Sequence, residues 1–241
     1  MQLRVKQKLS SELILPIGYH HILQSILYSN MKDQRGYSDF IHNEGYAYHD
    51  RQFRMFTFSL LEGKYSIHEG KIIFRDEVSF EVRSPDHRLI QLIKDNIEER
   101  GIRYPNVTVT DIILALSDDQ VDDDNILIRM GSPLTVYTTD ENTKQTHFYS
   151  PEESRFAMLV NDNFKRKYSA YTGMLPETDV MLEPVKISPK DKYVTNYKGF
   201  YLSGWKGWYR LTGERRYLDF LYQTGIGAKN AQGFGLFYVV K

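Results

Sequence analysis

The sequence predicts an α+β protein built from two tandem ferredoxin-like domains. Segments with strand-like alternation and segments with helical periodicity follow one another in the order strand, helix, strands, helix, strand, and this order occurs loosely twice. The two occurrences are separated by SDDQVDDDN at residues 117–125, which holds five Asp and lacks apolar periodicity. We therefore expect a first domain at residues 1–117, an acidic linker at 118–125 and a second domain at 126–241.

The first half begins with alternating apolar and charged residues and turns helical soon afterwards. Apolar residues recur on one helical face after Pro16, which predicts a helix from Gly18 to about Met31. A second amphipathic helix, DHRLIQLIKDNIEER at 86–100, is expected to end at Gly101. The expected strands of this half occupy residues 3–8, 53–61, 65–74 after a Glu62–Gly63 turn, 78–82 and 107–116.

The second half repeats the pattern. Residues 152–172 place Phe156, Val160 and Phe164 on one helical face, and a short helix is expected around Arg215–Tyr222. The expected strands occupy residues 126–138, 148–149, 180–187, 194–211 and 235–240.

Composition excludes several classes of protein. Of the 241 residues, 41% are hydrophobic and 26% are charged, which is typical of a globular protein and not of a disordered one. No apolar run approaches the ~20 residues that cross a bilayer, and the charged N-terminus MQLRVKQKLSSELIL is unlike a signal peptide. The absence of cysteine excludes disulfides, thiolate nucleophiles and cysteine metal sites. We expect a cytoplasmic protein with no membrane partner.

The net charge is zero, but the charge is unevenly distributed. Residues 1–154 carry 17 Lys and Arg against 24 Asp and Glu, whereas residues 155–241 carry 14 against 7. Aromatic residues adjoin basic ones in FKRKY at 164–168 and WKGWYR at 205–210. Cations for phosphates beside aromatic planes for bases indicate single-stranded nucleic acid as a partner, although each feature alone also suits a solvated face or a core strand.

The most informative motif is GIGAKNAQGFG at residues 225–235, directly before the last expected strand. Its glycines permit positive φ angles, and successive backbone N–H groups beside Lys229 form a cradle for phosphate. The loop lacks the GK[ST] of a Walker motif, and it precedes a strand, unlike a dinucleotide fingerprint. The alternative is a tight turn before a strand.

With this loop, the sequence resembles a known family. A loop of the form GxGxxNxxGFG before a C-terminal strand is similar to the signature of the CRISPR-associated RAMP superfamily. LPIGYHHILQSILYSN at 15–30, FIHNEGY at 40–46 and FRMFTFSLLEG at 53–63 resemble the CRISPR repeat-processing endoribonucleases, the Cas six family. The resemblance covers nearly the whole chain. It implies a tandem RAMP or RRM-like fold and metal-independent cleavage of the CRISPR precursor transcript within each repeat.

The resemblance also implies a reaction and its catalytic residues. In this family the ribose 2′-OH attacks the adjacent phosphorus and expels the 5′-oxygen. His42 matches the catalytic histidine and is expected to be the principal acid or base. Tyr28 matches the catalytic tyrosine and would position or deprotonate the 2′-OH, although a helix residue packed on the sheet is the alternative. Arg54 stands where the family often has lysine; it would stabilise the phosphorane but make a poor general acid.

Other histidines and basic residues complete the expectations. His49 competes with His42 for the catalytic role. His20 and His21 are expected to be exposed at the start of the first helix, with contact to phosphate as the alternative. The absence of HxH and HExxH patterns leads us to expect no metal and no cofactor. The expected RNA contacts are the loop residues Gly225, Gly227, Lys229, Asn230, Gly233 and Gly235, with Lys165, Lys167, Lys190, Lys192 and Lys206 as further candidates for phosphate.

The partner implied by the resemblance is CRISPR repeat RNA, as a single strand or a weak hairpin. Subunits of a CRISPR effector complex and a second copy of the chain are further candidate partners. The alternative function is a RAMP subunit that holds repeat or guide RNA in such a complex without cutting it. A third alternative, an unrelated ferredoxin-like domain, would leave the glycine loop unexplained.

Overall fold

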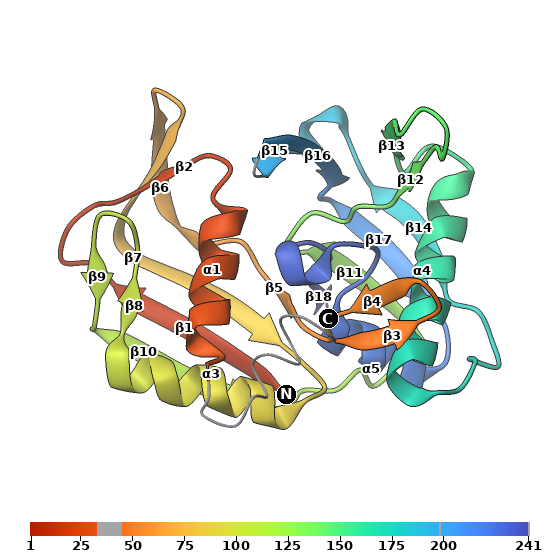
Figure 1. Ribbon diagram of the computed structural model, residues 1–241, viewed down its shortest axis with the longest axis horizontal. Helices are drawn as coiled ribbons and strands as arrows, with labels where there is room; N and C mark the ends of the chain where they lie inside the picture. The colour runs from red at the N-terminus through yellow and green to blue at the C-terminus, as the bar shows by residue number, and fades with distance from the viewer. Residues whose placement is uncertain (33–44, 198, 241) are drawn as a thin grey trace.

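The computed structural model describes residues 1–32, 45–197 and 199–240. In these residues two α+β halves lie side by side, each with one main antiparallel sheet and two described helices (Figure 1). The described part of the chain contains no helix that combines the length and apolar character needed to cross a lipid bilayer.

The first half contains a sheet in the order β10-β1-β7-β2, with β5 and β6 also paired to β7. Helix α3 packs against β1, β10 and α1, so the two helices of this half contact each other. The elements are β1 (Gln2–Lys8), β2 (Leu13–Pro16), α1 (His20–Asn30), β3 (Tyr46–Tyr48), β4 (Arg51–Phe53), β5 (Thr57–Phe58), β6 (Glu62–His68), β7 (Lys71–Arg83), α3 (His87–Arg100), β8 (Ile102–Arg103), β9 (Thr108–Val109) and β10 (Ile112–Ser117).

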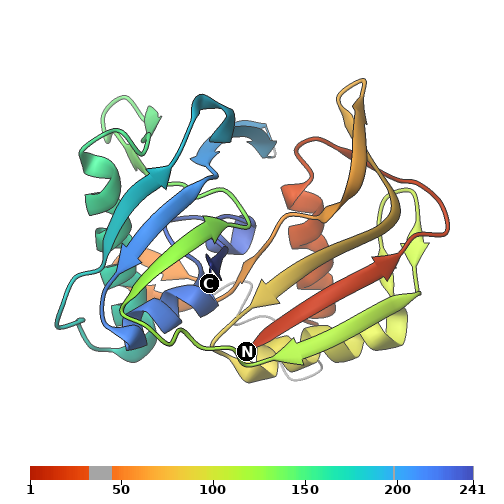
Figure 2. The same ribbon diagram turned by 180° about the vertical axis from the view of Figure 1, so that it is seen from behind.

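The second half contains a sheet in the order β14-β17-β11-β18, with the small hairpins β12–β13 and β15–β16 beside it. Figure 2 shows the strands of both main sheets from the side opposite to α1. The elements are β11 (Asn125–Met130), β12 (Tyr137–Thr139), β13 (Thr146–Phe148), α4 (Arg155–Thr172), β14 (Met181–Lys186), the 3-10 turn η2 (Pro189–Asp191), β15 (Lys192–Tyr197), β16 (Phe200–Trp205), β17 (Trp208–Thr212), α5 (Arg215–Thr224), the 3-10 turn η3 (Asn230–Gln232) and β18 (Phe237–Val240).

This arrangement confirms the prediction of two tandem ferredoxin-like folds. Helix α3 begins and ends where its signals predict: the Asp86 side chain accepts the N–H of Arg88 at the start, and Gly101 has φ 69° at the end. Each half has its own hydrophobic core. The two cores account for the apolar periodicities of the sequence.

Several strand boundaries differ from the prediction. The turn expected at Glu62–Gly63 lies at Glu69–Gly70, where both residues have positive φ, as a two-residue β-hairpin turn requires. Gly63 instead marks a bulge within β6. The long strand expected at 194–211 is three strands, separated at Gly199 and Gly207, which both have positive φ.

The acidic segment between β10 and β11 forms no helix or strand, yet it is held at both sides. The Gln2 side chain donates to the Asp119 carbonyl 2.9 Å away, and the Val121 N–H donates to the Asp219 carboxylate of α5 at 3.3 Å. Val121 itself is buried in the second core. The domain boundaries around this segment stay a prediction.

The β3–β4 hairpin crosses the expected division of the chain. It precedes the acidic segment by some 65 residues of sequence, yet it contacts α4 in the second half (Figure 1). The Tyr46 ring lies 5.2 Å from the Tyr171 ring, and Met55, just after the hairpin, is 1% exposed within the second core. The hairpin therefore belongs by packing to the second half.

Candidate nucleic-acid interface

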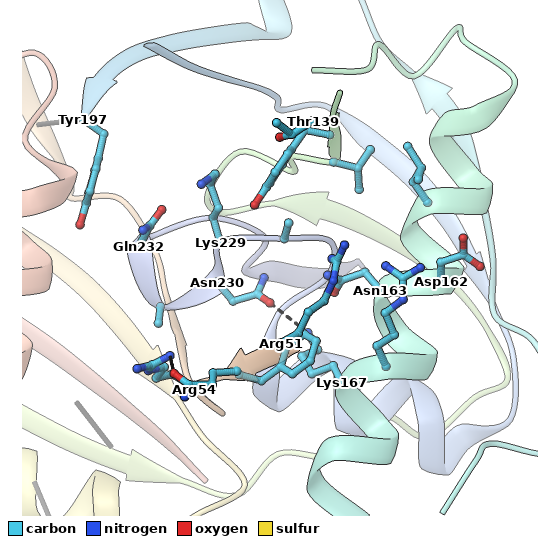
Figure 3. A pocket seen from close by; sticks show the side chains of 18 of the residues that line it. Arg51, Arg54, Thr139, Asp162, Asn163, Lys167, Tyr197, Lys229, Asn230 and Gln232 are labelled. Carbon is cyan, nitrogen blue, oxygen red and sulfur yellow. Dashed lines mark hydrogen bonds between the residues drawn. The ribbon is translucent and has the colours of Figure 1, made fainter. Parts of the chain in front are cut away.

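A cleft of about 1110 Å³ lies between the two halves of the molecule. Its walls come from α1, the β3–β4 hairpin, α4, the segment around β12 and the glycine-rich loop 225–235. Six lysine and arginine residues line it: Arg51, Arg54, Arg155, Arg166, Lys167 and Lys229. Asp162 is the one carboxylate among the described lining residues (Figure 3). Such an excess of cations in a concave site attracts a polyanion.

Helix α1 forms one wall and presents Tyr28 to the cleft. The Tyr28 ring meets Phe56 edge to face with centroids 5.8 Å apart, which anchors it against the core of the first half. Burial raises the pKa of the Tyr28 hydroxyl, and the nearby Arg54 charge acts in the opposite direction. At neutral pH the hydroxyl is therefore protonated and can orient a ligand oxygen.

The β3–β4 hairpin brings two arginines to the cleft. Arg51 is the first residue of β4, and Arg54 directly follows the last residue of that strand. One guanidinium nitrogen of Arg54 lies 3.4 Å from Oε1 of Gln52. Since the hairpin is packed on α4, the first half supplies the arginines and the second half positions them.

Helix α4 forms the opposite wall. Arg155, Asp162 and Arg166 recur at helical spacing on the face that lines the cleft. Phe156 and Val160, on the other face, are buried in the second core. The helix therefore separates a packing face from a charged face.

The glycine-rich loop joins the two halves at the base of the cleft. Three side chains of the first half contact its carbonyl groups. Gln24 Nε2 donates to Ala231 O at 2.7 Å, Thr57 Oγ1 donates to Phe234 O at 3.2 Å, and His20 Nδ1 lies 3.2 Å from Gln232 O. The loop is thereby fixed relative to α1, which carries Tyr28.

Close packing explains the need for glycine at Gly233 and Gly235. Both have positive φ, at 85° and 80°. A Cβ on Gly233 would lie 2.7 Å from the Phe58 ring, and one on Gly235 would lie 2.0 Å from Ile226 O. A side chain at Gly233 would push the loop away from the first half, and one at Gly235 would push apart two segments of the loop.

Two of the expected RNA contacts, Asn230 and Lys167, have their polar atoms in the interior of the loop. The Asn230 side chain is 7% exposed: its amide donates to Ile226 O and Phe234 O, and its oxygen accepts from Lys167. Lys167 is 1% exposed and also donates to Gly225 O. Both residues lie at the cleft wall, but their polar atoms are bonded within the loop (Figure 3), and a contact of either with RNA stays a prediction.

The remaining candidate RNA contacts in the loop differ in exposure. Lys229 is half-exposed, lines the cleft and lies with its Nζ 4.8 Å from the centre of the Tyr137 ring. The four glycines, in contrast, are buried, so they shape the loop and present little surface. They are Gly225, Gly227, Gly233 and Gly235.

The other basic candidates lie elsewhere. Lys190 and Lys192 are exposed at the start of the β15–β16 hairpin, and the half-buried Lys206 follows β16, over the Tyr193 ring. Lys165 forms an ion pair with Asp179 at 2.6 Å. None of these four lines the cleft, and a contact with RNA stays a prediction for each.

The candidate histidines differ in burial and in their position relative to the cleft. His42 lies outside the described residues. His20 was expected to be exposed, but it is completely buried between the loop and Tyr193, and burial lowers its pKa to about 4. His21 lines the cleft, whereas His49 is exposed at the hairpin turn and does not.

Sequence reasoning missed several lining residues. Arg155 and Arg166 could have been found as polar positions opposite the apolar stripe of α4. Lys167 was identified, but as a candidate phosphate contact; it falls on that apolar stripe, and a lysine at a core position is a signal for a specific internal partner. Arg51 and Tyr197 carry no comparable signal. Among the described residues, no group of three or more His, Asp or Glu side chains is placed to hold a metal ion.

Known proteins are similar over most of the chain. A protein from Methanocaldococcus jannaschii, named CRISPR-associated endoribonuclease Cas6 1, is 22% identical over 98% of this chain and 91% of its own length. A Pyrococcus furiosus protein, named putative CRISPR-associated endoribonuclease-like protein Cas6, is 26% identical over 72% of each chain.

Solved structures share the fold. A structure described as CRISPR associated protein Cas6 superposes with a TM-score of 0.80 at 22% identity, covering 100% of this chain and 99% of the other. A structure described as an RAMP protein binding different RNA substrates gives 0.82 at 20% identity, covering 100% of both. The family model described as CRISPR associated protein Cas6, C-terminal, matches residues 116–239, which is half of the chain. The chain therefore belongs to the Cas6 family of CRISPR-associated proteins.

Proposed function

We propose that this protein is an endoribonuclease that cleaves CRISPR precursor RNA within its repeats and binds that RNA in the cleft between the two halves. The observation that carries the proposal is the cleft itself. In a member of the Cas6 family, six lysine and arginine residues and one carboxylate line it together with Tyr28. The names of the two relatives, an endoribonuclease and a putative endoribonuclease-like protein, support the same activity.

The proposed chemistry is metal-independent attack by the ribose 2′-OH on the adjacent phosphorus. The 5′-oxygen leaves with a proton, and the products are a 2′,3′-cyclic phosphate and a 5′-OH. Arg54 carries a permanent charge and stabilises the phosphorane. Tyr28 orients the 2′-OH, since its raised pKa makes it a poor base. His42, which lies outside the described residues, is assigned to proton transfer on the resemblance alone.

The test uses purified protein, a repeat-containing RNA from its own genome and excess EDTA. Cleavage at one site by the wild type, lost in His42→Ala, supports the proposal. A single 2′-deoxy substitution at the cut position should abolish cleavage, because it removes the nucleophile. Continued cleavage of that substrate would refute 2′-OH attack.

A second candidate function is RNA binding without cleavage. Arg54 favours it, because arginine cannot readily donate a proton to the leaving oxygen. A protein of this kind would bind the repeat tightly in the same cleft and hold the RNA for the other subunits of a complex. Tight binding with no cleavage by wild type, His42→Ala or Arg54→Lys would favour this candidate. A homodimer stays a prediction, checked by light scattering.

A further inference from the structure

Lys167 is a buried cation on the packing face of α4. It shares that face with Phe156, Val160 and Phe164, and its side chain is almost completely removed from solvent. Burial of an ammonium is costly unless every donor finds a strong acceptor. At this position the sequence of the helix calls for an apolar residue, so the lysine requires a specific explanation.

The partners of Lys167 are two groups of the glycine-rich loop. Its Nζ donates to Gly225 O, at the loop's first residue, and to Asn230 Oδ1 at 3.0 Å, in its middle. The Asn230 amide then donates to Ile226 O at 3.2 Å and to Phe234 O at 3.1 Å. The ammonium is therefore the start of a hydrogen-bond network that joins both ends of the loop from the inside.

This network determines where Lys229 lies. Lys229 precedes Asn230 directly and has φ 61°, a conformation that costs a non-glycine residue energy unless its surroundings impose it. With Asn230 fixed from inside, the neighbouring Lys229 side chain extends to the cleft surface beside Tyr137 (Figure 3). The position of the Lys229 side chain at the cleft therefore depends on the buried Lys167.

We propose that Lys167 is a positioning residue for RNA binding: its ammonium fixes the glycine-rich loop from within, so that Lys229 faces the cleft, and RNA binding favours the charged form. The inference rests on the proposed function, because it takes the cleft as the RNA site. It assigns Lys167 no contact with RNA.

The electrostatic surroundings link the network to pH. Burial lowers the pKa of Lys167 to about 7. RNA phosphates in the cleft favour the ammonium and raise this pKa, so binding takes up a proton, and affinity falls as pH rises above about 7. The charged groups on the surrounding elements are Arg155, Asp162, Lys165 and Arg166 of α4, Arg51 and Arg54 at β4, Lys229 of the loop, and Arg215, Arg216 and Asp219 of α5.

The test compares wild type with Lys167→Met, which keeps the length of the side chain and removes its charge. Lys94→Met is the matched control, because Lys94 lies on α3 and does not line the cleft. Binding of fluorescent repeat RNA is measured by anisotropy at pH 6.5, 7.5 and 8.5 at constant ionic strength. Amide hydrogen exchange of the free proteins reports on the loop.

We expect Lys167→Met to bind RNA about tenfold more weakly than wild type at pH 6.5. The affinity of wild type and of Lys94→Met should fall between pH 6.5 and 8.5, whereas that of Lys167→Met should stay constant. The N–H of Ile226, which donates to Gly235 O, should exchange faster in Lys167→Met. Unchanged affinity, pH profile and exchange in a folded Lys167→Met would overturn the proposal.

Two further measurements keep the proposal testable if Lys167→Met does not fold or if wild type binds no repeat RNA. If Lys167→Met does not fold, calorimetry of wild type with RNA at pH 7.5, in phosphate and in Tris, measures proton uptake. Zero uptake overturns the proposal, and uptake supports it. If wild type binds no repeat RNA, the proposed function fails, and loop exchange alone decides whether Lys167 fixes the loop.

Discussion

Replacement of Gly235 by alanine is the sharpest test of how the glycine-rich loop is built. Gly235 has φ 80°, and an added Cβ would lie 2.0 Å from Ile226 O and 2.6 Å from the Asn230 amide nitrogen. The loop cannot move aside freely, because the Gly235 N–H donates to Pro133 O at 2.9 Å and Ile226 N–H donates to Gly235 O at 2.8 Å. The substitution must therefore break contacts or distort the backbone.

The expected loss has two components. A left-handed conformation costs an L-residue about 1 to 2 kcal/mol, and overpacking at a buried site adds about 1 to 3 kcal/mol. Alanine restores about 0.4 to 1 kcal/mol by restricting the unfolded chain. We expect the free energy of unfolding to fall by about 1 to 5 kcal/mol.

Gly70→Ala is the matched control. Gly70 lies in the β6–β7 turn with φ 73°, and an added Cβ meets no atom within 4 Å. It therefore has the same conformational cost without the overlap, and we expect a loss of about 1 kcal/mol or less. Urea unfolding monitored by fluorescence measures both variants. A loss for Gly235→Ala no larger than that for Gly70→Ala would refute the close-packing argument.

Three further predictions concern the cleft and its base. Arg54→Ala should slow single-turnover cleavage at least tenfold with little effect on repeat binding, and an unchanged rate would remove Arg54 from the reaction. Lys229→Ala should weaken binding similarly for all RNA sequences and lower the salt slope of log Kd by about 1; an unchanged slope would exclude a phosphate contact. Burial lowers the pKa of His20 to about 4. Between about pH 6.5 and 4 the unfolded chain therefore binds more protons than the folded protein, and the free energy of unfolding should fall by up to about 3 kcal/mol as the pH decreases through this range. Urea unfolding at several pH values checks this, and His20→Gln should show a smaller decrease; an equal decrease in both would contradict the assignment.

Local patterns sufficed to predict the order of elements. The α3 boundaries follow from Asp86 and Gly101, whose capping roles depend on neighbours within four residues. Strand boundaries near glycine were harder, because a glycine fits a bulge, as at Gly63, and a turn, as at Gly70. The choice between the two depends on pairing across the sheet, which a single segment does not contain.

The candidate site was predictable only where residues resemble the family. Tyr28, Arg54 and Lys229 were identified on motifs and do line one cleft. The burial of His20 was not predicted, because its partners Tyr193 and Gln232 are more than 170 residues away in sequence. Asn230 was identified for its chemistry, but the choice between contact with RNA and contact with its own loop is made by the packing of Lys167.

The path of the chain between the two halves has a consequence for synthesis. The β3–β4 hairpin emerges from the ribosome long before α4, on which it packs, and Arg83 at the end of β7 donates to Phe237 O, 154 residues later. The first half therefore lacks these late partners of Arg83 and of the hairpin until residues 155–240 have been made. A nascent chain that stops before residue 225 has Tyr28 and Arg54 but no base to its cleft, so the ability to hold RNA is acquired only with these late residues.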